Sequence, residues 1–270
     1  MPQTINTNVA SLNAQRNLNT SQASLATSMQ RLSSGLRVNS AKDDAAGLAI
    51  ADRMNTQVRG INVAIRNAND GISMAQTAEG ALATITDALQ RMRELAVQSL
   101  NGTNGVSDRG NLDTEFLALQ SEINRIATQT KFNDVAIVGT GATTNTFQIG
   151  ANNGETLTIT TTDASAIVTG LAVASVASAG AALTAIDTAL NTVNTQRATY
   201  GAAMSRFSYA ISNLQIASEN QTAARGRIMD ADFAAETANL SRAQILQQAG
   251  TAMVAQANAL PNTVMTLLKG

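Results

Sequence analysis

The sequence predicts a mainly α-helical fold: a long antiparallel helical bundle or coiled-coil rod, with a small β-hairpin region and no independent outer domain. Three observations predict it. The two prolines are Pro2 and Pro261, so the interior of the 270-residue chain lacks the residue that most strongly breaks helices. Apolar residues recur at spacings of three and four over long stretches. One segment, 141–170, instead alternates threonine with apolar residues, which is typical of strands.

Two long apolar stripes predict the central helices of the bundle. The stripe in the second half consists of Leu183, Ile186, Leu190, Val193, Tyr200, Met204, Phe207, Ile211 and Leu214. A matching stripe runs from Val58 to Leu82, and a new register continues it to Ala96. Such stripes favour coiled-coil-like packing. Arg197 and Glu79 interrupt them. They could form a buried pair, face a neighbouring subunit, or extend to solvent from the edge of the bundle.

The two ends of the chain carry similar stripes. We predict that these terminal helices form a polymer interface, because a pair of helices alone gives each stripe only one neighbour to pack against. The residues assigned to this interface are Leu18, Leu25, Leu32, Leu246, Met253, Leu260, Val264 and Leu267. The terminal pair therefore requires further copies of the chain.

The helical pattern is interrupted twice, at equal distances from the two ends. The interruptions are "LSSGLRVNSAKDDAAGLAIADRM", 32–54, and "ARGRIMDADFAAE", 224–236. If the chain folds back antiparallel on itself near its middle, the two interruptions lie side by side. They then form a joint between the terminal helix pair and the bundle, with segments near 34–46 and 225–234.

Gly35, Asp43, Asp44 and Gly47 are the joint residues, with Gly35 and Gly47 flanking a non-helical connection. The predicted domains are a terminal helix pair, 1–45 plus 225–270, and a bundle, 46–224.

The remaining connections can be placed from turn signals. "NGTNGVSDRGN", 101–111, links two helices, and "ANNGET" predicts the turn of a β-hairpin within the region near 139–170. The segment 171–182 is ambiguous and leads into the last long helix. The threonines at 158–162 form either a solvated strand face or a site of O-glycosylation.

Composition excludes several classes of function. Cysteine and histidine are absent, which removes disulfides, thiolate chemistry and the commonest general base and metal ligand. The net charge of -1, without a basic stripe, argues against nucleic acid. No signal peptide and no apolar run long enough to insert into a membrane is seen. We expect no enzyme, cofactor or metal site.

Two acidic motifs have a chemical and a structural interpretation. "KDD", with Asp43 and Asp44, could be a carboxylate pair for acid–base work, but acids at the start of a helix are favoured for capping. "DADFAAE" loosely resembles a calcium loop, but lacks the glycine and the later glutamate that such loops need.

Five motifs resemble those of bacterial flagellin, in the same order along the chain. They are "INTNVASLNAQRNL", "LSSGLRVNSAKDDAAGLAIADRM", "NDGISMAQTAEGAL", "LQRMRELAVQSLNGTN" and "SRAQILQQAGTAMVAQANALPNTVMTLL". The resemblance covers roughly 1–135 and 185–268. It resembles a short form, because few residues separate the two helical blocks.

This resemblance implies a structural subunit that polymerises into the extracellular flagellar filament for swimming motility. It also implies export by the flagellar type III apparatus, a dedicated export chaperone and a filament cap. The terminal pair would form the inner tube of the filament and the bundle its outer tube. Alternatives are a hook–filament junction protein and a secreted coiled-coil adhesin.

The resemblance further implies a contact with Toll-like receptor 5 of animal hosts. Gln90, Arg91, Leu95 and Glu115 match the positions of that contact. Arg91 and Leu95 are four residues apart and are expected to share one exposed helical face. Alternatively, Arg91 and Glu115 hold neighbouring subunits together in the filament.

Overall fold

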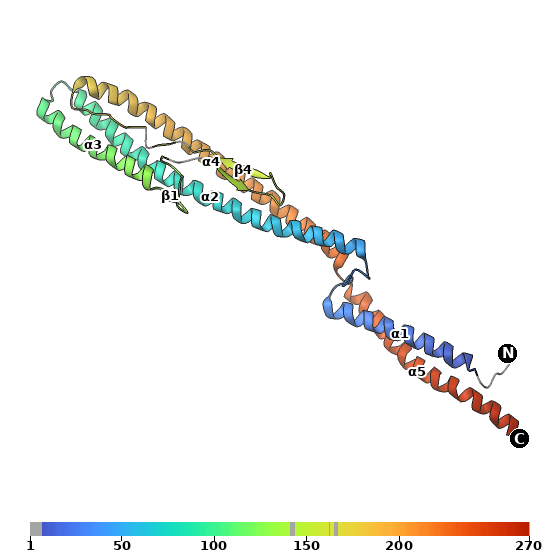
Figure 1. Ribbon diagram of the computed structural model, residues 1–270. Coiled ribbons are helices and arrows are strands. Elements are labelled where there is room, and N and C mark those ends of the chain that lie inside the picture. Colours follow the sequence, from blue (N-terminus) through green and yellow to red (C-terminus); the bar gives the residue numbers. More distant parts are fainter. Residues whose placement is uncertain (1–6, 141–143, 162, 165–166, 270) are drawn as a thin grey trace. The chain divides into compact units, whose positions relative to one another are not determined.

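The computed structural model describes residues 7–140, 144–161, 163–164 and 167–269, and the side chains of these residues up to 260. The elements are five helices and four short strands within this part of the chain. The helices are α1 (Val9–Ser34), α2 (Ala45–Leu100), α3 (Val106–Gln129), α4 (Val176–Met229) and α5 (Phe233–Lys269). The strands are β1 (Lys131–Phe132), β2 (Val135–Ala136), β3 (Asn145–Gln148) and β4 (Thr156–Ile159). The predicted mainly helical fold with a small β region is confirmed (Figure 1).

The chain divides into two compact units. The first, which we call the terminal unit, comprises residues up to Thr56 and from Asn220 onward, and the second, the bundle unit, comprises Gln57–Glu219. The terminal unit thus extends further into α2 and α4 than the boundaries at 45 and 225 taken from the sequence. One reason is a contact between these helices, because Arg225 Nη1 donates to Asn55 Oδ1 over 3.1 Å.

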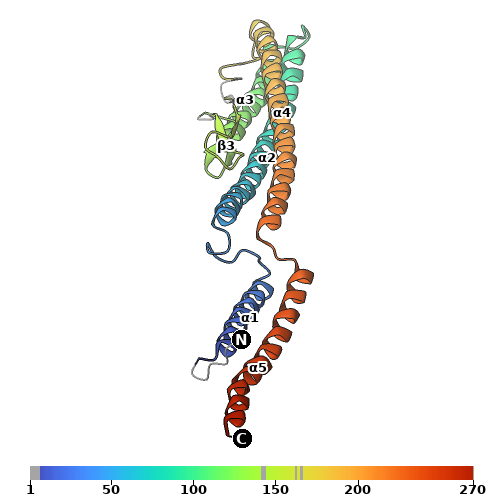
Figure 2. The same ribbon diagram turned by 90° about the vertical axis from the view of Figure 1, so that its right-hand side faces the viewer.

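The bundle unit is an antiparallel arrangement of long helices (Figure 2). Within it α2 and α4 run side by side in opposite directions, as shown by ion pairs between Arg93 and Asp187 at 2.7 Å and between Arg197 and Glu79 at 3.7 Å. Both Arg197 and Glu79 are partly exposed, so the two charges that interrupt the stripes face each other across the edge of one chain. Helix α3 lies beside α2.

A continuous apolar core fills the bundle unit. Its almost completely buried large side chains come from α2, α3, α4 and the strands, and include Leu82, Leu89, Met92, Phe116, Ile123, Ile159, Ile186, Tyr200 and Phe207. The Tyr200 hydroxyl donates to the Ile137 carbonyl over 2.9 Å, and burial raises the pKa of Tyr200 to about 12. This bond satisfies the one polar atom that the phenol brings into the core.

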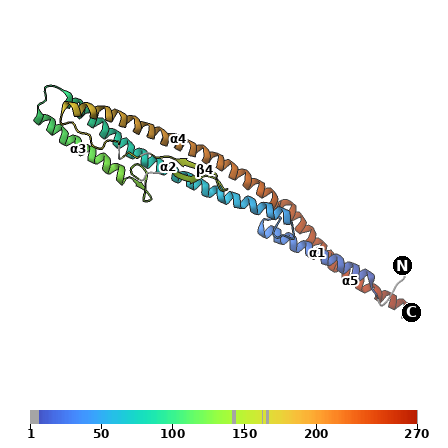
Figure 3. The same cartoon turned by 45° about the horizontal axis from the view of Figure 1, so that its top comes forward.

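The predicted β-hairpin is confirmed by strands β3 and β4 (Figure 3). They pair antiparallel, with Asn145 opposite Ile159 and Gln148 opposite Thr156. In β4 the buried Leu157 and Ile159 alternate with exposed residues. The hairpin is fixed to the bundle by an edge-on contact of the Phe147 and Phe207 rings at 5.5 Å.

A second, shorter hairpin was not predicted. Strands β1 and β2 are joined by Asn133 and Asp134, whose φ angles are 48° and 62°. Asn and Asp tolerate positive φ better than other residues with a side chain, and two such residues in succession suit a tight hairpin turn. The dipeptide "ND" between apolar residues was the available signal.

Helix α4 begins at Val176, inside the segment that was ambiguous in the sequence. The hydroxyl of Ser175 accepts a bond from the Ser178 amide at 3.2 Å, as a helix-capping serine does. No helix among the described residues is long and apolar enough to cross a membrane.

Candidate assembly surface

Helices α1 and α5 pair along a seam of small and polar residues. From α1 the seam is formed by residues at alternating spacings of three and four, with Ser11 and Ser28 buried and Leu18, Ser21, Leu25 and Leu32 half-buried. From α5 it takes the buried Glu236, Ala243 and Ala257, with Leu240, Gly250 and Val254 half-buried. This seam is close, because a Cβ atom added to Gly250 would lie 3.0 Å from Leu18 Cδ1.

Polar bonds connect the two helices at the chain ends. The Asn8 side-chain amide donates to the Ala257 carbonyl over 2.7 Å, and the Ser11 hydroxyl donates to Asn258 Oδ1 over 2.6 Å. Asn8 also caps α1 by accepting from the Ser11 amide. At the other end Arg31 and Glu236 form an ion pair at 3.7 Å.

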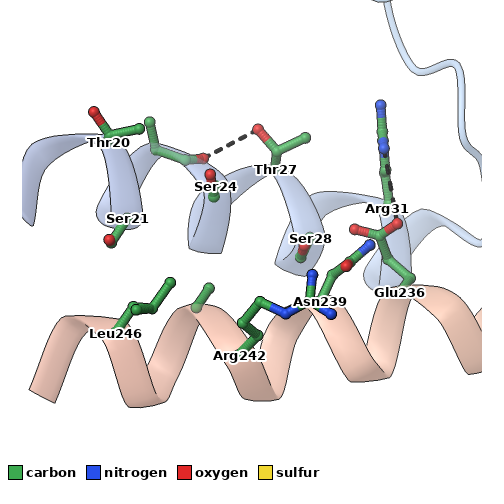
Figure 4. Close-up of a pocket in the computed structure, with 12 residues that line it drawn as sticks. Thr20, Ser21, Ser24, Thr27, Ser28, Arg31, Glu236, Asn239, Arg242 and Leu246 are labelled. Atoms are coloured by element: carbon green, nitrogen blue, oxygen red, sulfur yellow. Dashed lines mark hydrogen bonds and ion pairs between the residues drawn. The ribbon is translucent and has the colours of Figure 1, made fainter. Parts of the chain in front are cut away.

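A groove separates α1 and α5 near this ion pair (Figure 4). Its volume is about 520 Å³, and hydroxyl groups of α1 line it opposite Asn239 and Arg242, which point from α5 into the groove. Leu246 also lines the groove, so this stretch holds one large apolar side chain among small and polar ones.

Of the large exposed apolar residues described for the terminal unit, only Leu246 lines this groove. Those with more than a third of their surface exposed on α1 and α5 are Val9, Leu12, Met29, Phe233, Ile245, Leu246, Met253 and Leu260. Among them Leu246, Met253 and Leu260 are seven residues apart and lie along one side of α5. Large apolar residues that are exposed together on one side of a helix are typical of an interaction surface.

The predicted interface residues thus fall into two groups. Leu18, Leu25 and Leu32 are half-buried in the seam with α5, whereas Leu246, Met253 and Leu260 are exposed. Val264 and Leu267 lie outside the residues whose side chains are described. Sequence reasoning missed that the seam uses a different line of α5, because glycine and alanine carry little signal in an apolar pattern.

The two interruptions of the helical pattern lie side by side, as predicted. The Arg37 amide donates to the Met229 carbonyl over 2.6 Å, and the Ala231 amide donates to the Gly35 carbonyl over 3.0 Å. Leu36 and Asp230 form an isolated antiparallel bridge. Residues 35–44 and 230–232 thus form a short paired connection between helices.

Each predicted joint residue has a distinct place. Gly35 ends α1 with a φ of 72°, a left-handed conformation that favours glycine. Asp44 Oδ1 accepts from the Gly47 amide over 2.8 Å, so Asp44 caps α2. Gly47 therefore lies in the first turn of α2 and does not flank the connection, because the capping aspartate starts the helix before it.

Asp43 organises the connection itself. Its Oδ2 accepts from the Asn39 amide, the Ser40 amide and the Ser40 hydroxyl over 3.1, 2.9 and 3.0 Å. These hydrogen bonds, first that of the Ser40 hydroxyl, lower the pKa of Asp43. Asp232 has the same kind of role at α5, where its Oδ1 accepts from the Ala234 and Ala235 amides. The acidic motifs are used for capping.

The predicted receptor contact lies on α2 and α3 of the bundle unit. Gln90 is exposed, and the half-exposed Arg91 and Glu115 form an ion pair at 2.8 Å. A second pair joins Arg91 to Glu94 at 2.9 Å, and these carboxylates raise the pKa of Arg91. Arg91 and Glu115 were expected to join neighbouring subunits or a receptor, but here they join two helices of one chain.

Leu95 does not share the exposed face of Arg91. It is 1% exposed and belongs to the core of the bundle unit. The physical reason is that the core takes side chains from α3 as well as α4, which widens the buried face of α2 beyond the stripe of Leu89, Met92 and Ala96. Leu95 therefore offers no surface to a receptor in this fold.

The structure defines a mainly helical class of protein, in which paired terminal helices with exposed apolar residues accompany a helical bundle. The comparisons with known proteins specify the family. The bacterial flagellin N-terminal helical region matches residues 5–143, and the bacterial flagellin C-terminal helical region matches 183–268. The chain belongs to the bacterial flagellin family and is a structural subunit of the flagellar filament.

Two named flagellins align with almost the whole of this chain. A flagellin of Halalkalibacterium halodurans is 46% identical, with 98% of this chain and 99% of the relative covered. Flagellin A of Vibrio anguillarum is 38% identical over 376 aligned positions, so it contains residues that this 270-residue chain lacks. This chain is a short form of the family.

A solved structure supports the fold. The crystal structure of Bacillus cereus flagellin is similar with a TM-score of 0.52 and 34% identity, over 55% of this chain and 88% of that one. The comparisons do not favour a hook–filament junction protein or a secreted adhesin.

Proposed function

We propose that the exposed apolar faces of α1 and α5 are the surface through which copies of this chain assemble, and that the terminal helices form the inner tube of the filament. The contrast between the seam and the outer faces carries the proposal. The seam buries serine and alanine, whereas Met253 and Leu260 are more than half exposed and Leu246 is half exposed where it lines the groove. Burying them against further copies removes apolar surface from water and drives association.

The domain assignment follows from the same contrast. Residues 1–45 and 225–270 supply the assembly helices, and residues 46–224 form the outer tube, because the bundle unit has its own apolar core. The segments near 34–46 and 225–234 are the joint between the two parts.

Polymerisation of a single exposed-face variant tests the proposal. Leu260→Gln should raise the critical concentration for filament formation at least about tenfold, since it places a polar group in an apolar contact. Val106→Gln is the matched control, because Val106 is 84% exposed at the start of α3, outside the terminal helices. Sedimentation of filaments from purified monomer measures both. Equal critical concentrations for the two variants would contradict the assignment.

Membership of the family supports a wider set of partners. We infer that the chain has a structural and not an enzymatic role, and is exported by the flagellar type III apparatus to an extracellular filament. A dedicated chaperone binds the C-terminal end before export, and a cap assists assembly at the filament tip. Removal of residues 233–270 should abolish co-purification with the chaperone while the bundle unit stays folded.

We also propose that Gln90, Arg91 and Glu115 contact Toll-like receptor 5. The supporting observation is that these side chains lie exposed together on α2 and α3. Arg91→Ala should weaken binding of monomer to the receptor by about tenfold or more, as truncation of a hot-spot arginine does. Glu94→Ala is the control, because it removes the other ion pair of Arg91 but leaves Glu115 in place. Unchanged receptor affinity of Arg91→Ala would exclude this residue from the contact.

A further inference from the structure

The sulfur chemistry of this chain is confined to thioethers. The sequence has nine methionines and no cysteine, the side chain whose thiolate two-electron oxidants attack before methionine. Two-electron oxidants such as hydrogen peroxide therefore act mainly on methionine sulfur, and they act fastest where that sulfur is accessible to solvent.

The described methionines differ sharply in exposure. Met29 on α1 is 57% exposed and Met253 on α5 is 61% exposed. Met74 and Met92, in the core of the bundle unit, are 3% and 0% exposed. Met54, Met204 and Met229 lie between these extremes. The two accessible thioethers thus belong to the terminal helices.

Both lie among the apolar residues that we assign to assembly. Met253 lies midway between Leu246 and Leu260 on the exposed side of α5. Met29 is one of the exposed large apolar residues of α1, and neither methionine is among the residues of the seam between α1 and α5. Their chemical state consequently changes the exposed faces and leaves the seam itself intact.

We propose that Met29 and Met253 are oxidation sites, and that their conversion to sulfoxides by peroxide blocks assembly of the monomer. This inference rests on the proposed assembly surface. In the reaction the sulfur lone pair attacks one peroxide oxygen, the O–O bond breaks, and the thioether gains that oxygen while the remainder leaves as water. The sulfur loses two electrons and the peroxide is reduced by two.

The product has a strongly polar S=O group in place of a soft apolar one. A polar group buried without a hydrogen-bond partner opposes association, and Leu246 and Leu260 on the same side of α5 offer no donor. The oxidised monomer therefore stays soluble. Sulfoxide reductases restore the thioether with two electrons and two protons from a thiol, which makes the switch reversible.

Peroxide treatment of purified monomer tests the site assignment first. Peptide mass analysis should find one added oxygen at Met29 and at Met253 at least about tenfold faster than at Met74 and Met92, since sulfoxide formation follows exposure. In assembled filament the rates at Met29 and Met253 should fall towards those of the buried methionines. Equal rates at the exposed and buried positions in monomer would overturn the proposal.

Assembly of the treated monomer tests the consequence. Oxidation at both sites should raise the critical concentration at least about tenfold, and methionine sulfoxide reductase should restore the original value. The double variant Met29→Leu, Met253→Leu has no thioether at these positions, so its own critical concentration should be the same before and after the same peroxide treatment.

The possible failures are distinguishable. If untreated monomer does not assemble through the terminal helices, the proposed function fails. If untreated monomer assembles and the doubly oxidised monomer assembles equally well, the redox inference alone fails. It fails too if oxidation abolishes assembly of the double leucine variant as fully as that of the parent, because other methionines would then be responsible.

Discussion

The terminal unit and the bundle unit are built from similar helices but differ in what they bury. In the bundle unit the buried residues include Phe116, Leu89 and Tyr200, drawn from three helices. In the terminal unit the buried apolar residues, within the described part of the chain, are Val38, Ala51, Ala243 and Ala257. The apolar pattern of a helix therefore does not decide whether the helix is stable in the monomer. The number and size of the side chains that pack against it decide this.

Amide hydrogen exchange of dilute monomer should reveal this difference most strongly. Amides in the middle of α2 and α4 should exchange at least about a thousandfold more slowly than those of α1 and α5, because core helices open only with global unfolding. The terminal helices have too few apolar partners to offset their ordering entropy. In filament, α1 and α5 should gain protection. Strong protection of α1 and α5 in dilute monomer would mean that the seam alone stabilises them.

Truncation of one leucine in each unit sharpens the comparison. Leu89→Ala should lower the free energy of unfolding of the bundle by about 2–5 kcal/mol, the usual cost of a cavity at a fully buried leucine. Leu18→Ala, in the seam, should change the free energy of unfolding of the bundle by less than about 0.5 kcal/mol. Leu18 is partly exposed and lies outside the bundle core, and substitutions at such sites usually have small effects. Thermal unfolding of monomer measures both. A similar loss of stability in the two variants would show that the units unfold as one.

A glycine of the joint separates assembly from monomer stability. Gly35→Val places a β-branched residue at a φ of 72°, so it should disturb the end of α1. Because Gly35 is far from the core of the bundle unit in sequence and lies in the terminal unit, the melting temperature of monomer should change little. Filament shape in electron micrographs should change clearly. Filaments identical to those of the parent would show that the left-handed conformation at Gly35 is not needed.

The sequence predicted the parts of this fold that rest on regular patterns. The helices, the hairpin at β3 and β4 and the pairing of 32–54 with 224–236 follow from spacing, turn residues and symmetry about the middle of the chain. What the sequence could not predict depends on which further segments pack against a helix. Leu95 lies beside the stripe of α2 and not in it, yet it is buried in a core to which α3 as well as α4 contributes side chains. The seam line through Gly250 and Ala257 was likewise missed, because close approach selects small residues whose hydrophobic signal is weak.

The smallest expected effect concerns acid sensitivity, which should be local to the joint. Three hydrogen bonds to its Oδ2 hold the pKa of Asp43 below the ordinary value of 3.8. A carboxyl with a depressed pKa in the folded state contributes stability above its unfolded pKa, and that contribution is lost as pH falls through the folded pKa. Lowering the pH from about 5 to below the folded pKa should therefore loosen the connection at Asn39 and Ser40 before it affects the bundle. Carboxyl chemical shifts in an NMR titration should show Asp43 titrating below the ordinary value of an aspartate, and Ser40→Ala should move its pKa back towards that value. If Asp43 titrates at the ordinary value in both the parent and Ser40→Ala, these hydrogen bonds do not hold the joint.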